Sequence, residues 1–260
     1  MKLLNLKALS GFFLLVLSLT FFMPLPCATA KALRIASDAD YEPFSYTDAQ
    51  GRPAGFDVDI ARALCSEMNK ECEIVLMSFD EIMPALIKGE VDVAVAGLGM
   101  TPERQKSVDF TDRYYRSHSI FVQRAGSFQD TGIDSLKGKK AGAQTGTIQE
   151  NYLHRIYGDN IKIIGKPIFE DLFKDLHSGA VDIIFADGLP AYAVLKSNLG
   201  EGLEPIGMPV APTDAEANSH IAVSKKYPGL REDLNKAIQA ILRNGEYDRI
   251  NRKYFDFNIY

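Results

Sequence analysis

Apolar runs that predict strands alternate with helical patterns, and this order limits the possible folds more than any other feature of the sequence. In the first half, strands are predicted at Leu33–Ala36, Glu73–Met77 and Asp92–Leu98. Helices are predicted between them, from Gly55 through Asn69 and from the capping sequence Ser78–Glu81 to Gly89. This strand–helix–strand–helix–strand order favours a parallel sheet with right-handed connections, in which ligands bind beyond the carboxyl ends of the strands.

A second unit of the same order follows residue 119. Its predicted strands and helices are Ala141–Ala143, Ile148–Tyr157, Ile161–Ile164, Phe169–His177 and Val181–Phe185. The polar stretch Gly200–Ser219 is expected to run back towards the first half. A strand at Ile221–Val223 and helices at Leu230–Asn244 and Tyr247–Tyr254 should follow it.

These elements predict an α/β chain of two lobes, each a mostly parallel sheet flanked by helices. Residues 31–118 and 220–260 form lobe 1 in this prediction, and residues 119–219 form lobe 2. Two crossing segments, near Ser117–Phe121 and Asn218–Ala222, should join the lobes. A ligand site is expected in the cleft between them.

The stretch Asp92–Thr111 is the strongest local candidate for a binding site. Its strand runs into Gly97-Leu98-Gly99, where a ligand can approach the backbone closely. Thr101 is a suitable helix N-cap, and Pro102 suits the first helical position. Arg104 in that first turn is a candidate for holding a carboxylate with both arms of its guanidinium. Alternatively, it is a surface arginine paired with Glu103 or another nearby acid.

The N-terminus has the pattern of an export signal. Lys2 and Lys7 precede the apolar run Gly11–Phe22, and small residues at 28–30 suit cleavage after Ala30. Residues 1–30 are therefore predicted to be a signal peptide, and the remaining chain to be soluble and exported. Cys27 offers the alternative of a lipid anchor, for which the preceding Pro24-Leu25-Pro26 is a poor lead-in.

Composition excludes some partners and indicates others. The net charge of −5 argues against nucleic acid and against anionic membranes as partners. In an oxidising compartment Cys65 and Cys72 are expected to form one disulfide, the alternative being two buried thiols. The four histidines are scattered, so we expect no metal site. A monomer without a cofactor is expected.

Several stretches together carry a family resemblance. They are GFDVDIARAL, the series VDVAVAG–GMTPER–VDFT, KGKKAGAQTGTIQE and the ending KYFDFNIY. They resemble the periplasmic substrate-binding proteins of polar amino-acid ABC importers (family 3 solute-binding proteins), most of all the lysine/arginine/ornithine- and histidine-binding branch. The resemblance covers essentially the whole mature chain. It implies the two-lobe periplasmic-binding-protein fold (type II), capture of a free amino acid by hinge closure, and delivery to a membrane permease.

The resemblance also implies roles for individual residues. Arg104 would clamp the ligand α-carboxylate together with Thr147, and Asp187 would accept the α-ammonium. Tyr41 and Phe79 would enclose the ligand side chain, and Asp38 would meet its cationic end. Gln144 would line the pocket from lobe 2, while Gly97 and Gly99 would contact the ligand through their backbone. The nearby acids Asp40, Glu42 and Asp57 are expected to be solvated or helix-capping.

The sequence departs from the pattern of the basic-amino-acid-binding branch at three positions. Members of that branch usually carry serine where Gly97 and Gly99 stand, and threonine where Ile148 stands. The extra room would admit a bulkier or derivatised ligand. The expected ligand is therefore a cationic amino acid (lysine, arginine, ornithine or histidine) or a derivative of one.

Two other functions are compatible with such a chain. A few relatives with this fold are periplasmic cyclohexadienyl or arogenate dehydratases, which need an acid/base group beside a leaving hydroxyl. We find no nucleophile–base pair in the predicted rim loops and expect no catalytic residue. The second alternative is a sensor whose ligand-bound form docks on a membrane receptor, which the cleft residues do not distinguish from docking on a permease.

Overall fold

The computed structural model describes residues 31–211 and 218–260. The predicted signal peptide 1–30, its cleavage after Ala30 and the question of Cys27 lie outside the described residues. The strands are β1 (Leu33–Asp38), β2 (Tyr46–Thr47), β3 (Pro53–Ala54), β4 (Cys72–Met77), β5 (Val93–Gly99), β6 (Val108–Arg116), β7 (Ser119–Arg124), β8 (Lys140–Gln144), β9 (Lys162–Lys166), β10 (Ile183–Asp187), β11 (Leu203–Val210) and β12 (Asn218–Ser224).

The α-helices are α1 (Phe56–Glu67), α2 (Phe79–Lys88), α3 (Pro102–Ser107), α4 (Ile133–Leu136), α5 (Ile148–Tyr157), α6 (Phe169–Ser178), α7 (Gly188–Leu195), α8 (Leu230–Arg243) and α9 (Glu246–Tyr254). Two short 3₁₀ turns are η1 (Gly158–Asn160) and η2 (Asn198–Gly200). Within the described ranges, no helix has the length and apolar content needed to cross a bilayer.

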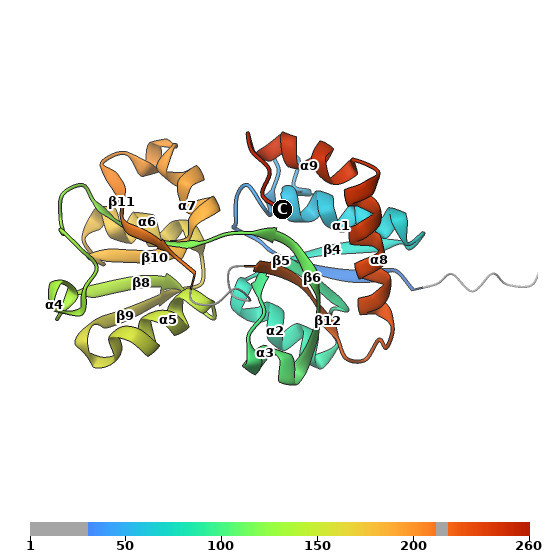
Figure 1. Ribbon diagram of the computed structural model, residues 1–260, viewed down its shortest axis with the longest axis horizontal. Helices are drawn as coiled ribbons and strands as arrows, with labels where there is room; N and C mark the ends of the chain where they lie inside the picture. The colour runs from blue at the N-terminus through green and yellow to red at the C-terminus, as the bar shows by residue number, and fades with distance from the viewer. Residues whose placement is uncertain (1–30, 212–217) are drawn as a thin grey trace, which may run out of the picture. The chain divides into compact units, whose positions relative to one another are not determined.

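Two five-stranded sheets form the framework of the chain (Figure 1). The first sheet has the order β4-β1-β5-β12-β6, and the second has the order β11-β7-β10-β8-β9. This confirms the predicted two-sheet α/β architecture. The limits predicted for the two lobes stay a prediction.

The sheets are mixed, where the sequence predicted them to be mostly parallel. In the first sheet β1 runs parallel to β4 and β5, as the helical crossovers require, whereas β12 runs antiparallel to β5 and β6. In the second sheet β8 runs parallel to β9 and β10, whereas β7 runs antiparallel to β10 and β11. The chain crosses from one sheet to the other between β6 and β7 and again between β11 and β12, and these strands form the antiparallel pairs. No local pattern in the sequence predicts the direction of these strands.

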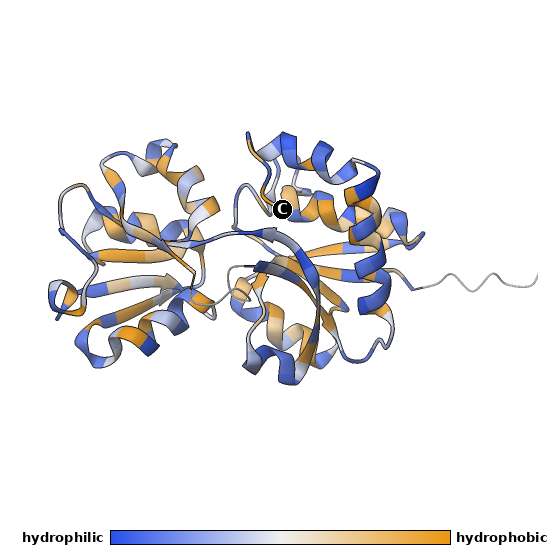
Figure 2. Ribbon diagram, in the orientation of Figure 1, coloured by the Kyte–Doolittle hydropathy of each residue, from blue (hydrophilic) through white to orange (hydrophobic). Residues whose placement is uncertain are grey.

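The central strands are apolar because helices cover the sheets. Of β5, only Gly97 is not buried, and in β10 the buried run is Ile183–Ala186. Figure 2 shows these strands as hydrophobic ribbon, with polar residues gathered on the outer faces of the helices. Helices α1 and α8 contribute Ile60, Leu64, Leu234 and Ile238 to the largest apolar cluster. Continuous apolar runs of this kind are the expected signature of strands buried on both faces.

Helix ends follow the predicted capping chemistry with one exception. The Thr101 hydroxyl accepts the Arg104 N–H at 3.2 Å, and the Thr147 hydroxyl accepts the Glu150 N–H at 3.2 Å. Gly89 ends α2 in the left-handed conformation, with φ 74°. The predicted cap at Ser78 is wrong. Its hydroxyl donates to Asp80 Oδ1 at 2.6 Å and caps no backbone N–H.

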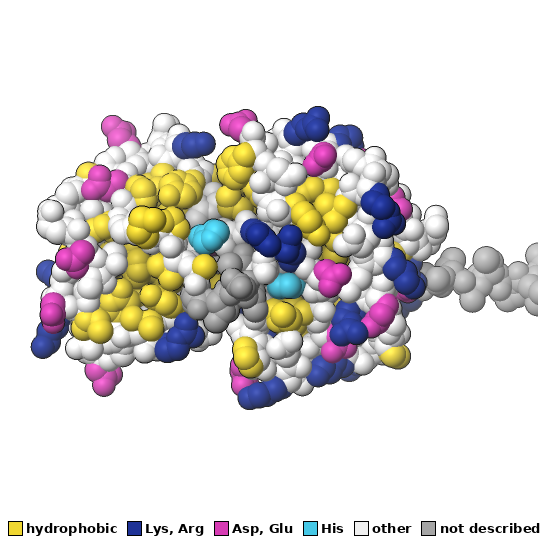
Figure 3. Space-filling model, viewed as in Figure 1, with side chains coloured by type: hydrophobic (Ala, Val, Ile, Leu, Met, Phe, Trp, Pro, Cys, Tyr) yellow, Lys and Arg dark blue, Asp and Glu magenta, His cyan; other side chains and the backbone are white. Residues whose placement is uncertain are grey.

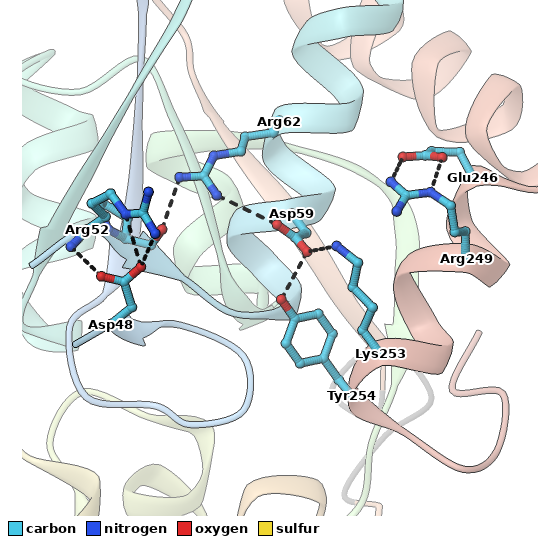
Figure 4. Close-up of polar contacts among 9 residues, drawn as sticks. Asp48, Arg52, Asp59, Arg62, Glu246, Arg249, Lys253 and Tyr254 are labelled. Atoms are coloured by element: carbon cyan, nitrogen blue, oxygen red, sulfur yellow. Dashed lines mark hydrogen bonds and ion pairs between the residues drawn. The ribbon is translucent and has the colours of Figure 1, made fainter. Parts of the chain in front are cut away.

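The end of the chain is fixed to the start of α1. Asp59 accepts hydrogen bonds from Lys253 Nζ at 2.8 Å and from the Tyr254 hydroxyl at 2.9 Å (Figure 4). Arg62 forms an ion pair with Asp59, with Nη1 3.6 Å from Oδ1, and its Nη2 donates to the Pro53 carbonyl. At the other end of α1, Cys65 is bonded to Cys72 at the start of β4, which confirms the predicted disulfide. Acidic and basic side chains are interspersed on the face of the molecule in Figure 3.

Candidate functional site

A pocket lies where the carboxyl ends of strands from both sheets meet. Gly99, Gln144 and Asp187 line it, and each is the last residue of its strand. Five α-helices begin at the same place: α2, α3, α5 and α7 follow these strands and β4 directly, and α6 begins at Phe169 in the pocket wall. Parallel strands deliver their following loops and helix starts to one edge, so this arrangement is the expected position of a ligand site.

Eight of the nine residues predicted to bind ligand lie in the wall of this pocket. They are Tyr41, Phe79, Gly97, Gly99, Arg104, Gln144, Thr147 and Asp187. The ninth, Asp38, lies directly behind the wall. Gln144 Nε2 donates to its Oδ2 at 2.9 Å.

Arg104 connects the loops of the two sheets. Its Nη1 donates to the Gly99 carbonyl at 2.8 Å and its Nη2 to the Gly146 carbonyl at 2.9 Å. The guanidinium carbon lies 5.9 Å from the centre of the Phe79 ring, within the range of a cation–π contact. Glu103, the alternative partner suggested by the sequence, forms its ion pair with Lys106. The half-buried guanidinium is therefore held at the pocket by backbone carbonyls from both sides.

The start of α5 lies beside Arg104, whose guanidinium donates to the carbonyl of Gly146 just before the N-cap Thr147. Thr147 is buried, and its hydroxyl donates to the Gln144 carbonyl at 2.7 Å while capping the helix. The Glu150 carboxylate accepts the Gly146 N–H at 2.8 Å, whereas in a capping box it would accept the N–H of Thr147, the N-cap residue. Ile148 and Gln149 in the first turn also line the pocket. A helix N-terminus carries partial positive charge, so this wall and Arg104 together favour an anion.

Asp187 supplies negative charge on another side of the pocket. It caps α7 by accepting the Leu189 N–H at 3.2 Å, and the Ser117 hydroxyl donates to the same oxygen. Burial raises the pKa of the Asp187 carboxyl, and hydrogen bonds from Ser117 and Tyr41 oppose that rise. The carboxyl group thus has donors in place that favour its charged form.

Asp38 is a second acidic group, and it is almost fully buried with 2% of its surface exposed. Burial raises the pKa of Asp38 to about 6, and the hydrogen bond from Gln144 partly opposes that rise. Gln144 also donates to the Pro167 carbonyl at 3.1 Å. The Gln144 amide therefore links a buried acid of the first sheet to the second sheet.

Aromatic rings enclose the space between these charges. Tyr41 is buried and contacts Phe169 edge to face, with ring centres 5.3 Å apart. Phe79 is the first residue of α2 and Phe169 the first of α6. The sequence pointed to Tyr41 and Phe79 but missed Phe169, whose pattern is that of an ordinary core position at a helix start. Ser117, His118, Ser119, Gln149 and Ser219 were missed as well, although Ser117–Ser119 fell in a predicted crossing segment.

One predicted acid lies in an unexpected environment. Asp57, expected to be solvated or capping, is fully buried with 0% of its surface exposed. Its Oδ1 accepts the hydroxyl of Tyr114 at 2.8 Å. Among the described residues, no group of His, Cys, Asp and Glu side chains has an arrangement that could hold a metal ion.

The chain belongs to the bacterial extracellular solute-binding proteins, family 3, whose family profile it matches over residues 33–257. It is 35% identical to the L-arginine-binding protein of Pseudomonas aeruginosa, over 98% of each chain. It is 32% identical to the histidine-binding periplasmic protein of Escherichia coli K12, over 95% of this chain and 98% of that one. A solved structure of an ancestral arginine-binding protein bound to arginine superposes with a TM-score of 0.80 at 34% identity, covering 87% of this chain and 99% of the other.

Proposed function

We propose that this chain is a periplasmic, non-enzymatic binding protein that captures a cationic amino acid between its two lobes and delivers it to the membrane permease of an ABC importer. Lobe 1 would comprise residues 31–118 and 220–260, and lobe 2 residues 119–219. The ligand would be arginine, lysine, ornithine, histidine or a derivative of one of them. The relatives named for binding arginine and histidine support this class of ligand.

The observation that carries the proposal is that Arg104 and Asp187, a cationic and an acidic side chain, both lie in the wall of one pocket. A free amino acid has a carboxylate and an ammonium group on the same carbon, so it needs a cationic and an anionic partner close together. Arg104 and the start of α5 would take the carboxylate, because guanidinium and helix N–H groups both donate to anions. Asp187 would take the ammonium group.

A second acid supports a cationic side chain. Once Arg104 and Asp187 are paired with the backbone charges of the ligand, Asp38 is left as a buried carboxyl group bonded to the neutral Gln144 amide. An ammonium, guanidinium or imidazolium group near Asp38 would provide the opposite charge that a buried carboxylate needs. Tyr41, Phe79 and Phe169 would pack against the aliphatic or planar part of that side chain.

Contacts between the lobes provide the closed state that the proposal requires. Arg104 reaches Gly146, Gln144 reaches Asp38, and Tyr41 contacts Phe169 across the pocket. A ligand that touches both lobes would add contacts available only when they are together, and so shift the population towards closure. The permease would then recognise the closed form.

Calorimetry with a panel of amino acids tests the proposal. We expect micromolar or tighter binding of at least one among arginine, lysine, ornithine and histidine. Citrulline is the matched control for arginine, because it has nearly the same shape without the positive charge. It should bind at least about tenfold more weakly, since the buried Asp38 would lose its counter-charge. Glutamate or glutamine as the only ligand would rule out the role of Asp38, and no binding of any amino acid would rule out the function.

A further inference from the structure

Strand β5 is irregular where it borders the pocket. Leu98 pairs with His220 and Ala94 with Ala222, and the register shifts between these pairs, so β5 carries a bulge. Gly97 lies in this bulge with a φ of 62°, a conformation that side-chain-bearing residues rarely adopt. A Cβ atom at Gly97 would lie 2.6 Å from the Tyr115 hydroxyl and 3.6 Å from the Tyr41 ring. The bulge therefore places bare backbone in the pocket wall between two tyrosines.

Two buried side chains outside the wall hold this bulge. The Gly97 N–H donates to the hydroxyl oxygen of Tyr114 at 2.9 Å. The Tyr114 hydroxyl in turn donates to Asp57 Oδ1 at 2.8 Å. Both Tyr114 and Asp57 are fully buried. A chain of hydrogen bonds thus runs from the start of α1, through a side chain of β6, to the pocket backbone.

Asp57 makes little other use of its carboxyl group. Its Oδ2 is buried and has no hydrogen-bond partner in the described part of the chain. A buried, half-satisfied carboxyl group is costly, and packing alone would be served better by an apolar residue of similar size. Burial also raises the pKa of Asp57 well above its ordinary range. Its bond to Tyr114 is therefore the contact that explains an acid at this position.

We propose that Tyr114 and Asp57 are positioning residues of the ligand pocket, which fix the bulge of β5 at Gly97 and so the shape of the wall between Tyr41 and Arg104. Neither residue lines the pocket. Tyr114 satisfies the Gly97 amide, and Asp57 orients the Tyr114 hydroxyl so that its oxygen accepts this bond. The expected effect on affinity rests on the proposed function, whereas the effect on the Gly97 amide does not.

Tyr114→Phe tests this role, because it removes the hydroxyl and keeps the ring. Tyr247→Phe is the matched control. The Tyr247 hydroxyl is also buried and donates to the Tyr114 carbonyl at 2.7 Å, so the control also loses a buried hydrogen bond, one against the two that Tyr114→Phe loses. In ¹⁵N-glycine-labelled protein, the Gly97 amide signal should move and exchange faster with solvent in Tyr114→Phe only. The Kd for the bound amino acid should rise about tenfold in Tyr114→Phe and change less than about twofold in Tyr247→Phe, although both melt at lower temperature.

Asp57→Asn provides the conservative variant. Its carbonyl oxygen can still accept the Tyr114 hydroxyl, so the Gly97 signal and the Kd should stay close to those of the unmodified protein. The proposal is overturned if Tyr114→Phe leaves the Gly97 amide unchanged, if the amide responds without a loss of affinity, or if Tyr247→Phe has the same effect on affinity. If the unmodified protein binds no amino acid, the proposed function fails. The amide response would still decide whether Tyr114 fixes the bulge.

Discussion

The cationic and the acidic end of the pocket differ in the groups that form hydrogen bonds to their charged side chains. At the Arg104 end, backbone carbonyls of Gly99 and Gly146 hold a guanidinium beside the start of α5. At the acidic end, Asp187 and Asp38 accept from side-chain donors, the Ser117 hydroxyl and the Gln144 amide, in addition to one backbone N–H each. Burial raises the pKa of both acids, and that of Asp38 reaches about 6.

Because of this difference, we expect recognition of the two ligand charges to depend differently on pH. A guanidinium stays charged at any pH that a folded protein survives, so capture of the carboxylate should not depend on pH. In the proposed function, capture of a cationic side chain would require Asp38 to be ionised, and burial of Asp38 in the free protein opposes that ionisation. We therefore expect the acidic end to determine both selectivity and pH dependence, and the Arg104 end to supply affinity for any amino acid.

The largest effect is expected from Arg104→Ala. The ligand carboxylate would be left in the pocket without its counter-charge, at a cost of about 2–5 kcal/mol, or roughly 30-fold to several-thousand-fold in Kd. The loss should be similar for every amino acid bound, since all share this carboxylate. Arg52→Ala is the control, because Arg52 is exposed and pairs with Asp48 away from the pocket. Calorimetry measures both, and retained affinity in Arg104→Ala would remove the clamp from the proposal.

The next effect concerns the acidic end alone. Asp38→Asn keeps the shape of the side chain and removes its charge, so binding of a cationic ligand should weaken by about 1.5–3 kcal/mol, or roughly 10- to 150-fold. Citrulline should lose much less. The ratio of arginine to citrulline affinity would therefore fall towards one. An unchanged ratio would show that the cation is recognised elsewhere.

Much of this arrangement was predictable because it depends on local sequence. Thr101 with Pro102 marks the start of α3, Thr147 marks the start of α5, and Gly89 marks the end of α2. These signals act within a single turn of helix, and they locate the strand ends from which the pocket is built. The family resemblance supplied the individual residues at these strand ends, and eight of them lie in the pocket wall.

What was missed depends on contacts between distant segments or on misleading composition. Strands β6 and β11 were not predicted from the sequence. Charged residues occur throughout β6, and β11 contains Pro205 and Pro209, which are tolerated because β11 is at the edge of its sheet. The bonds that link Asp57 to Gly97 join residues far apart in sequence and belong to no motif. Phe169, at the start of α6 beside the second sheet, lies in the pocket wall, where its ring contacts Tyr41 from the loop after β1.

A smaller effect is expected from pH. Below about pH 6 a cationic ligand must displace a proton from Asp38, so its Kd should be about tenfold weaker near pH 5 than near pH 8. The free protein should show the opposite trend in stability. Because the pKa of Asp38 is higher in the folded state than the ordinary 3.8, the contribution of Asp38 to stability is fully present below about pH 4 and is lost as the pH rises through about 6. Calorimetry and thermal melts over this range measure the two trends.

Asp38→Asn is the control for both pH trends. It should flatten the part of each curve that Asp38 contributes, leaving the parts due to Asp187 and, for stability, Asp57, whose raised pKa values act with the same sign. An affinity for a cationic ligand that does not vary between about pH 5 and 8 would mean that Asp38 is ionised in the free protein throughout. In that case the acidic end would differ from the Arg104 end only in the sign of its charge.

The smallest effect is expected from Gln144→Leu, which removes the amide and keeps most of the volume. Its hydrogen bond favours the ionised form of Asp38, so without it the pKa of Asp38 should rise above 6. At pH 8 the closed state would lose one hydrogen bond between the lobes, worth about 1 kcal/mol or roughly fivefold in Kd. The midpoint of the pH dependence should also move upward. A fivefold loss without that movement would mean that Gln144 contributes only to closure, whereas a moved midpoint would show that this neutral amide sets the pH at which the pocket accepts a cation.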